Sequence, residues 1–167
     1  MGELRIRRGR QDDATAVAAL WTEAFAGPSG PRTEPYTEGD YRSFAEHGSV
    51  LLAERDGALD GVVGLLSPHS RHARVASGNE AEVARLATRR SGRRSGVART
   101  LMSQCEKEAR EHGRTALVLW TRPGQRAAHA LYDSLGFERI PNRDFVDTGE
   151  PCRAYRLTLG RVEESVH

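Results

Sequence analysis

Apolar and polar residues follow alternating and helical patterns that predict a series of strands and helices. Residues 4–7 alternate between apolar and polar side chains, which predicts a half-buried strand. Residues 12–25 space their apolar side chains along one face of a helix, with Asp12 or Asp13 as its N-cap. A second helix is expected over about 38–46. The N-terminal part of the chain therefore combines one strand with two helices.

The middle of the chain carries the pattern of a β-hairpin followed by a further strand. Apolar runs at 50–53 and 61–66 flank the dipeptide Asp56-Gly57, and Asp-Gly favours a tight hairpin turn. The next expected strand covers residues 80–88. Three consecutive strands without an intervening helix indicate antiparallel pairing in this region.

The C-terminal part predicts helices and strands in alternation. The run at 116–120 is apolar throughout, which is typical of a buried central strand. The expected elements are helices over 97–112 and 125–135, and strands over 116–120, 137–140 and 153–159. Strands and helices thus alternate at both ends around a central hairpin. We predict a single-domain α/β protein with a mixed sheet, covering residues 1–167 with its core at about 4–160.

Composition places the chain among globular proteins and narrows its location. No apolar run approaches the length of a membrane span, and the N-terminus lacks the apolar stretch of a signal peptide, so no membrane association is expected. Cys105 and Cys152 lack metal-ligand spacing, and Cys105 falls on the apolar stripe of a helix. We therefore expect no metal site and a reduced, cytoplasmic location. The net charge of only +2 predicts that the chain as a whole does not bind polyanions.

Residues 93–98, Arg-Arg-Ser-Gly-Val-Ala, form the stretch that says most about function. A turn before the helix that begins near Val97 exposes backbone N–H groups, and the first helical turn adds unpaired N–H groups and the positive end of the helix dipole. Gly96 has no Cβ, so a bulky anion can approach the backbone. Six arginines gather around this turn with no acid between them: Arg85, Arg89, Arg90, Arg93, Arg94 and Arg99. The stretch therefore predicts a phosphate-binding site.

The amino-acid sequence of this turn excludes two common phosphate-binding motifs. A P-loop needs Gly-Lys followed by Ser or Thr, and the only lysine is Lys107 in the middle of a helix. A dinucleotide-binding motif needs Gly-x-Gly-x-x-Gly, which the spacing of Gly92 and Gly96 does not provide. The remaining pattern, Arg-x-x-Gly-x-Ala, resembles the acyl-CoA pyrophosphate loop of the GNAT family of N-acetyltransferases. Residues 128–137 resemble the family's second signature, Ala-x-x-Leu-Tyr-x-x-x-Gly-Phe.

This resemblance implies the acyl-CoA N-acyltransferase fold, a mixed and mostly antiparallel sheet flanked by helices. It implies transfer of an acetyl group from acetyl-CoA to a primary amine on a small molecule or a protein. The backbone N–H of Leu86 would stabilise the oxyanion, Thr88 would pair with the pantetheine arm, and Gln125 stands where many relatives carry a cofactor-binding asparagine. The cofactor-binding residues implied in this way are Leu86, Ala87, Thr88, Arg93, Arg94, Ser95, Gly96, Val97, Ala98, Arg99 and Gln125.

The resemblance also implies an acid. Tyr132 occupies the position of a tyrosine that lies near the CoA sulfur in the family, and a phenol with a pKa near ~10 can donate a proton to a departing thiolate. The alternative is a tyrosine that only packs on the inner face of its helix.

For the base, the resemblance implies Glu82, at a strand position where histone-acetylating members carry a glutamate that acts through water. On a regular strand Glu82 shares a face with Ala84, Leu86 and Thr88. Glu80 is the second candidate on that face. Alternatively, both glutamates are solvent-facing carboxylates at the start of a strand. Other members place a base at the end of the strand after the long helix, where this chain has Trp120, which disfavours the ribosomal N-terminal-acetylating type.

The polar loop at 67–79 carries further candidates for the acceptor side. His69, Arg71, His72 and Arg74 would face an acidic substrate or assist proton transfer, or else they are solvated loop residues. A non-catalytic domain that senses acyl-CoA remains the alternative function. Nucleic-acid binding is disfavoured because the arginine cluster has no interleaved aromatic residues and no recognised reader motif. The oligomeric state stays open, a homodimer included.

Overall fold

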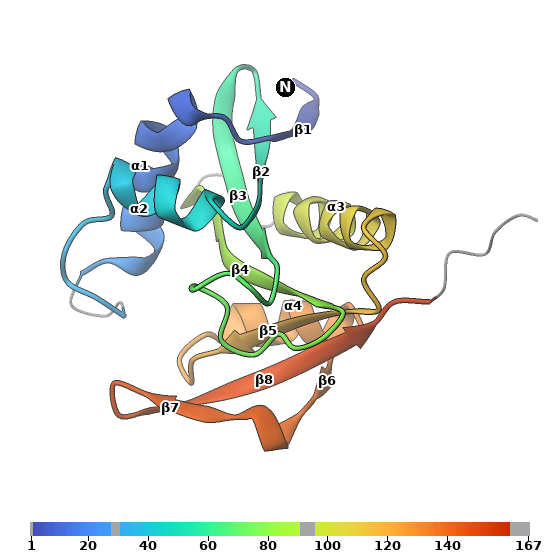
Figure 1. Cartoon of the computed structure of the whole chain (residues 1–167). Coiled ribbons are helices and arrows are strands. Elements are labelled where there is room, and N and C mark those ends of the chain that lie inside the picture. Colours follow the sequence, from blue (N-terminus) through green and yellow to red (C-terminus); the bar gives the residue numbers. More distant parts are fainter. Residues whose placement is uncertain (1, 28–30, 91–95, 161–167) are drawn as a thin grey trace, which may run out of the picture.

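The computed structural model describes residues 2–27, 31–90 and 96–160 (Figure 1). The first elements are β1 (Leu4–Arg8), a 3-10 turn (Gln11–Asp13), α1 (Ala14–Phe25), α2 (Glu38–Ala45), β2 (Gly48–Arg55), β3 (Ala58–Leu66) and β4 (Glu80–Thr88). They are followed by α3 (Val97–Glu111), β5 (Ala116–Thr121), α4 (Arg126–Ser134), β6 (Glu138–Arg139), a second 3-10 turn (Pro141–Arg143), β7 (Phe145–Asp147) and β8 (Glu150–Thr158). No helix in the described part of the chain is both long and apolar enough to span a membrane.

One sheet organises the molecule, and its strands lie in the order β1-β2-β3-β4-β5-β8-β6, with β7 paired to β8. Neighbouring strands are antiparallel except for β4 and β5, which are parallel because α3 connects them across one face. Asp56 and Gly57 have φ of 52° and 78°, as a hairpin turn between β2 and β3 requires. This mixed, mostly antiparallel sheet between helices confirms the predicted fold class.

Helices cover both faces of the sheet (Figure 1). On one face α1 and α2 pack against β2, β3 and β4 around Trp21 and Phe44. On the other face α3 and α4 bury a cluster that includes Leu101 and Cys105. Because each strand alternates its side chains between these clusters, the sheet is apolar on both faces.

β4 contains a β-bulge that the sequence analysis did not predict. Ala84 pairs with Gly64 and Ala87 pairs with Val62, so two residues of β4 face the single residue Val63. The first of the two, Arg85, has φ of 52°, a left-handed conformation that is uncommon outside glycine.

The bulge overturns the expected alternation along β4. Val83 and Leu86 belong to the α3 side, three residues apart, whereas Ala84 and Ala87 belong to the α1 side. The prediction that Glu82, Ala84, Leu86 and Thr88 share one face is therefore wrong, because the extra residue shifts the alternation. The bulge turns Leu86 toward the α3 side.

β4 and β5 pair only at their N-terminal ends. Their register covers Glu80–Glu82 against Ala116–Val118, although β4 continues to Thr88 and β5 to Thr121. In the described chain, residues 83–88 and 119–121 have no partner across this gap, so those backbone N–H and C=O groups that point into the gap, and not toward β3 or β8, stay available. Buried backbone groups of this kind require a partner, and a ligand can provide it.

Candidate active site

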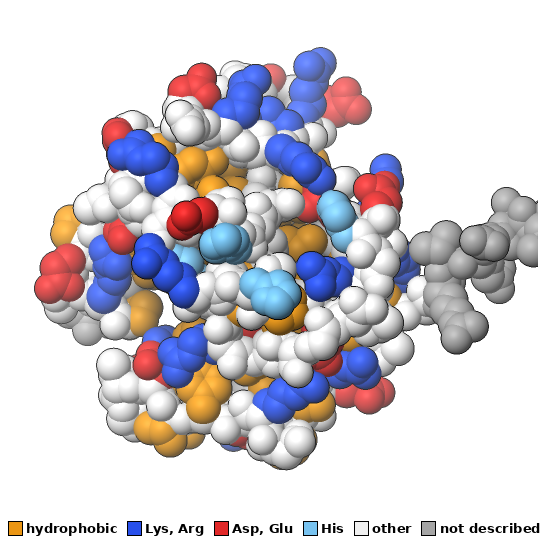
Figure 2. Space-filling view, viewed as in Figure 1, with side chains coloured by type: hydrophobic (Ala, Val, Ile, Leu, Met, Phe, Trp, Pro, Cys, Tyr) orange, Lys and Arg blue, Asp and Glu red, His pale blue; other side chains and the backbone are white. Residues whose placement is uncertain are grey.

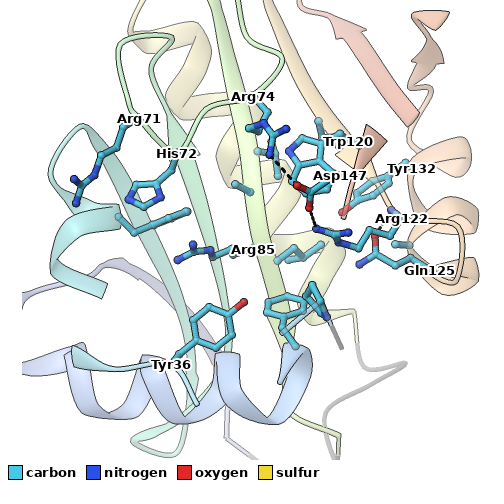
Figure 3. Close-up of a pocket in the computed structure, with 18 residues that line it drawn as sticks. Tyr36, Arg71, His72, Arg74, Arg85, Trp120, Arg122, Gln125, Tyr132 and Asp147 are labelled. Carbon is cyan, nitrogen blue, oxygen red and sulfur yellow. Dashed lines mark hydrogen bonds and ion pairs between the residues drawn. The ribbon is translucent and has the colours of Figure 1, made fainter. Parts of the chain in front are cut away.

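A cavity of about 410 Å³ lies where β4 and β5 part (Figure 3). Its walls come from α1, α2, the 67–79 loop, β4, β5, α4 and β7, so elements far apart in the chain meet around it. One wall carries Arg85 of β4, and the opposite wall carries Trp120 of β5 and Tyr132 of α4. A cavity of this size, lined by both apolar and polar side chains, is suited to a small-molecule ligand.

Arg85 lies on the β4 wall inside a cage of aromatic rings. Its guanidinium carbon is 4.6 Å from the ring centre of Phe44, 4.9 Å from Trp21 and 5.3 Å from Tyr36. These distances are within the range of cation–π interactions. The cage depends on Gly64, because a Cβ there would lie 2.1 Å from Cε1 of Phe44. Figure 3 shows the Arg85 side chain between Tyr36 and His72.

The Arg85 guanidinium is incompletely paired. Its Nη1 is buried and has no hydrogen-bond partner among the described residues. Burial lowers the pKa of Arg85, which reflects the cost of keeping this charge away from water. Arginine nevertheless keeps its proton at neutral pH. The β4 wall therefore presents a positive charge that needs an acceptor.

This placement corrects one expectation. Arg85 was grouped with the arginines around the phosphate-binding turn, but its side chain lies on the α1 side of the sheet. Two other members of that group also have partners elsewhere: Arg89 Nε donates to the carbonyl of Leu59 at 2.9 Å, and Arg90 lies 3.7 Å from Glu23. The bulge explains why the sequence spacing misplaced Arg85.

His72 lies near Arg85 on the cavity wall. Burial and the charges of Arg85 and Arg71 lower the pKa of His72, so its imidazole is neutral at neutral pH. Nε2 of His72 lies 3.0 Å from the hydroxyl of Ser43, which also accepts a hydrogen bond from Arg71. Of the loop candidates, His72, Arg71 and Arg74 line the cavity, whereas His69 is exposed and does not.

The opposite wall carries a compensated set of charges. Arg122 donates to the Asp147 carboxylate, and Arg74 lies 3.6 Å from the same carboxylate. The pKa of Asp147 is lowered, chiefly by the hydrogen bond from Arg122. The guanidinium carbon of Arg122 also lies 5.2 Å from the Trp120 ring centre. Arg122 and Asp147 could not be predicted as site residues, because no spacing in the sequence links the residue after β5 to β7.

Tyr132 and Gln125 place α4 on this wall. Tyr132 is buried, packs against Phe137 with ring centres 5.6 Å apart, and lines the cavity. Burial raises the pKa of Tyr132, so its phenol stays protonated. Gln125 also lines the cavity, and its side-chain oxygen accepts the N–H of Arg122 at 2.8 Å. The Gln125 oxygen is therefore already occupied by its own turn.

Glu82 has the surroundings of a structural residue. Its carboxylate is fully buried and does not line the cavity. It accepts the backbone N–H groups of Arg74, Val75 and Ala76 at 2.7–3.0 Å, which closes the 67–79 loop over β4. Burial raises the pKa of Glu82, and these hydrogen bonds act in the opposite direction. This geometry counts against the predicted base, since the carboxylate is fully buried and is not among the residues that line the cavity.

Glu80 is also committed to other partners. Its carboxylate accepts from Arg143 at 2.6 Å, from Arg156 at 3.1 Å and from the N–H of Ser77 at 2.9 Å. Burial alone would raise the pKa of Glu80, but these three partners outweigh burial, and the net effect is a lowered pKa. The alternative of two solvent-facing carboxylates is wrong as well, because both glutamates are buried.

The phosphate-binding turn is described only from Gly96 onward, and the expected contacts of Arg93, Arg94 and Ser95 lie outside the described residues. Gly96 has φ of 83° and precedes α3, and a Cβ at this position would meet no described atom within 4 Å. Val97 is buried in the core, and Ala98 is partly buried. Arg99 is exposed and donates to Ser134 at 2.6 Å. Among the described residues, none caps the start of α3 through its side chain or fills the space beside Gly96.

These features fit an extended acyl-CoA. Within the segment Leu86–Thr88, the backbone groups that point into the gap can pair with an amide-containing arm, as an added strand does. The open start of α3 supplies N–H groups for a diphosphate. The fold and the cavity together define the class of acyl-CoA-dependent acyltransferases.

Comparisons with known proteins agree with this class. The model of the Acetyltransferase (GNAT) family matches residues 14–137. The ribosomal-protein-S18-alanine N-acetyltransferase from Escherichia coli has 20% identity and a TM-score of 0.71, covering 99% of each chain. The Staphylococcus aureus Mu50 N-acetyltransferase has 18% identity and a TM-score of 0.77, covering 95% of this chain and 99% of the other. The Salmonella typhimurium protein yncA, solved with acetyl-CoA as its cofactor, has 18% identity and a TM-score of 0.74, covering 94% of each chain. No curated protein matches.

The chain belongs to the GNAT acetyltransferase family, because the family match covers most of its length. The resemblance stated from its two motifs is confirmed. The family makes the protein an acyltransferase that uses an acyl-CoA donor. The solved structures share its fold at identities of 20% or less.

Proposed function

We propose that the protein is an acetyl-CoA-dependent N-acetyltransferase that moves the acetyl group to a primary amine by direct attack. The observation that carries the proposal is the cavity between β4 and β5, which holds Leu86 and Tyr132 in its walls. Acetyl-CoA supplies an activated thioester. Its arm is proposed to lie along Leu86, Ala87 and Thr88.

The donor's phosphates are proposed to bind at the start of α3. The N–H groups of Gly96, Val97, Ala98 and Arg99 are suited to this role through their position in the first helical turn. Arg93, Arg94 and Ser95 are proposed to complete the site. The Gln125 amide nitrogen is proposed to contact the donor, since the Gln125 oxygen already binds Arg122.

In the proposed reaction the amine nitrogen forms a bond to the acetyl carbon, and the carbon–sulfur bond breaks. The N–H of Leu86 stabilises the negative charge on the carbonyl oxygen. Tyr132 gives its proton to the leaving thiolate, and its raised pKa supports this role because the phenol is protonated beforehand.

The attacking amine must also lose a proton. Glu82 is the base that the family resemblance implies, but its carboxylate is buried under the 67–79 loop and holds three backbone N–H groups. We therefore propose that Glu82 positions this loop, and that the amine proton leaves through water in the cavity. The two free, buried cysteines are compatible with the cytoplasmic location proposed for the protein.

Thermal melting with and without acetyl-CoA tests the proposal. A ligand at 100 times its dissociation constant adds about 2.7 kcal/mol to the free energy of unfolding. For a chain of this size the melting temperature should rise by roughly 5–10 °C. A panel of amines then tests turnover by release of free thiol. No shift with acetyl-CoA would refute donor binding, and a shift without turnover of any amine would indicate an acyl-CoA sensor.

A further inference from the structure

We propose that the acceptor is a small amine that also bears a carboxylate, and that Arg85 binds this carboxylate. The inference rests on the proposed N-acetyltransferase activity and names the substrate class of the same cavity. It starts from the one feature of the β4 wall that the proposed chemistry does not use, the caged Arg85 guanidinium.

The first argument is the missing partner of Arg85. Its buried Nη1 has no acceptor among the described residues, and no described carboxylate lies within ion-pair distance of it. Arg85 is half-buried and its Nη1 is buried, and a desolvated charge without a partner is costly, so native proteins pair such groups or reserve them for a ligand. An anion in the cavity, which Arg85 lines, would pair the charge of this guanidinium.

The nearby acids are already engaged. The charge of Asp40 acts on Arg85 from a distance, but this carboxylate lies 3.0 Å from Arg32 and caps α2 by accepting the N–H of Thr37. Asp147 is held by Arg122 and Arg74 on the opposite wall. His72 is neutral because its pKa is lowered. The surroundings of Arg85 are therefore positive on balance and suit an anionic ligand.

The geometry of the cage favours a carboxylate. Three aromatic rings surround the guanidinium, so the approach left to a ligand is from the cavity toward its nitrogen atoms. The nitrogen pairs of a guanidinium match the two oxygens of a carboxylate in a bidentate hydrogen bond. Lysine has a single nitrogen and cannot reproduce this match.

The position of Arg85 in the bulge links the anchor to the chemistry. Arg85 directly precedes Leu86, and both residues line the same cavity although they belong to opposite faces of β4. A carboxylate held at Arg85 leaves the rest of the ligand to extend toward the parting of β4 and β5. The cavity volume of about 410 Å³ restricts the acceptor to a small amine, such as an amino acid.

The test compares each of several α-amino acids with its own carboxamide as acceptor. The amide loses the negative charge but keeps the side chain and the amine. Its amine is also less basic, so intrinsic reactivity at neutral pH favours the amide. We expect kcat/KM to be about 10- to 100-fold higher for at least one acid than for its amide, the range of one charge-assisted hydrogen-bonded contact. This comparison needs only the unmodified protein.

Two substitutions locate the effect at Arg85. Arg85→Gln removes the charge and should remove the preference for the acid, mainly through KM, with the acetyl-CoA melting shift retained. Arg85→Lys keeps the charge and should restore only part of the preference. The control is Arg71→Gln, which removes an exposed charge at the same cavity and should leave most of the preference in place.

The outcomes separate the two proposals. A missing acetyl-CoA shift, or a shift with no turnover of any amine, refutes the acetyltransferase activity itself. Turnover of amides as fast as acids, turnover confined to a peptide N-terminus, or an acid preference that survives Arg85→Gln refutes the carboxylate anchor and leaves the activity intact. If Arg85→Gln and Arg71→Gln reduced the preference for the acid equally, the preference would come from the general positive charge of the cavity and not from a carboxylate bound to Arg85.

Discussion

The arginines on the two walls of the cavity differ in whether they have a carboxylate partner. On the β5 wall, Arg122 and Arg74 share the carboxylate of Asp147. On the β4 wall, Arg85 is surrounded by aromatic rings and its Nη1 has no acceptor in the described chain. Nη1 of Arg122 also lacks a hydrogen bond among the described residues, but it lies 3.5 Å from the Glu150 carboxylate, so the charges of the β5 wall are paired before any ligand enters. The β4 wall is completed by what it binds.

This difference distinguishes arginines that stabilise the fold from an arginine that is proposed to bind a ligand. The ion pairs of Asp147 with Arg122 and Arg74 hold together the end of β5, β7 and the 67–79 loop. They form without a ligand. An uncompensated guanidinium reduces stability and gains binding energy with the right partner, which is a common trade at functional sites. The four variants below test this division, from the largest expected effect to the smallest.

Tyr132→Phe separates chemistry on the β5 side from anchoring on the β4 side. Loss of the phenol proton should lower kcat by about 10²-fold, the usual contribution of a general acid. KM for the amine and the acetyl-CoA melting shift should stay nearly the same, because the ring still packs against Phe137. Steady-state kinetics measure this split. An unchanged kcat would leave Tyr132 as a packing residue only.

Glu82→Gln tests whether the carboxylate under the 67–79 loop supports the β5 wall or acts as the base. A glutamine places an NH2 group near backbone donors, so the free energy of unfolding should fall by about 1–3 kcal/mol. The melting temperature should fall by roughly 2–12 °C. Glu138→Gln, at an exposed site on β6, is the control. A large loss of kcat at an unchanged melting temperature would reinstate Glu82 as the base.

Asp147→Asn makes the β5 wall resemble the β4 wall. Arg122 and Arg74 lose their shared anion, so stability should fall by about 1 kcal/mol, because the pair is partly exposed. Succinate should then inhibit more strongly, since Arg74 loses its carboxylate partner and Arg122 keeps only Glu150, at 3.5 Å. Melting curves and inhibition kinetics measure both effects, with exposed Asp133→Asn as the control. Weaker inhibition by succinate would mean that the charge balance of this wall does not govern anion binding.

His72→Gln gives the smallest effect, a change in how stability depends on pH. In the folded protein burial and neighbouring arginines lower the pKa of His72, whereas in the unfolded chain it takes up a proton near pH 6.5. The unfolded state therefore binds more protons, and the wild type loses stability as pH falls below about 6.5. The variant should lose less between pH 7 and pH 5. His69→Gln, an exposed neighbour, should behave like the wild type.

The fold could be predicted from the sequence, because hydrophobic periodicity, the Asp56-Gly57 turn and the two motifs all agree with one topology. β7 escaped prediction, since it has only three residues and its turn, at Thr148 and Gly149, pairs it with β8. The site was predicted less completely. Alternation along a regular strand placed Glu82 beside Leu86, and the bulge at Arg85 broke that alternation.

The residues around Arg85 on the β4 wall show why this part of the site could not be predicted without the tertiary structure. Trp21, Tyr36 and Phe44 come from α1, α2 and the segment between them, and nothing in their spacing indicates that they surround one guanidinium. The one indication in the sequence was the charged residue Arg85 within the otherwise apolar segment Val83–Ala87. The roles of Tyr132, Leu86 and Gln125 stay predictions that the kinetic tests address.

The additional residue in β4 has an evolutionary consequence. Because position 85 faces one side of the sheet and position 86 the other, a substitution at the proposed carboxylate anchor leaves the proposed oxyanion donor in place. Relatives could therefore exchange acceptors by changing a single side chain while they preserve the catalytic step. A strand with one irregularity would in this way allow new specificities to arise on an unchanged reaction.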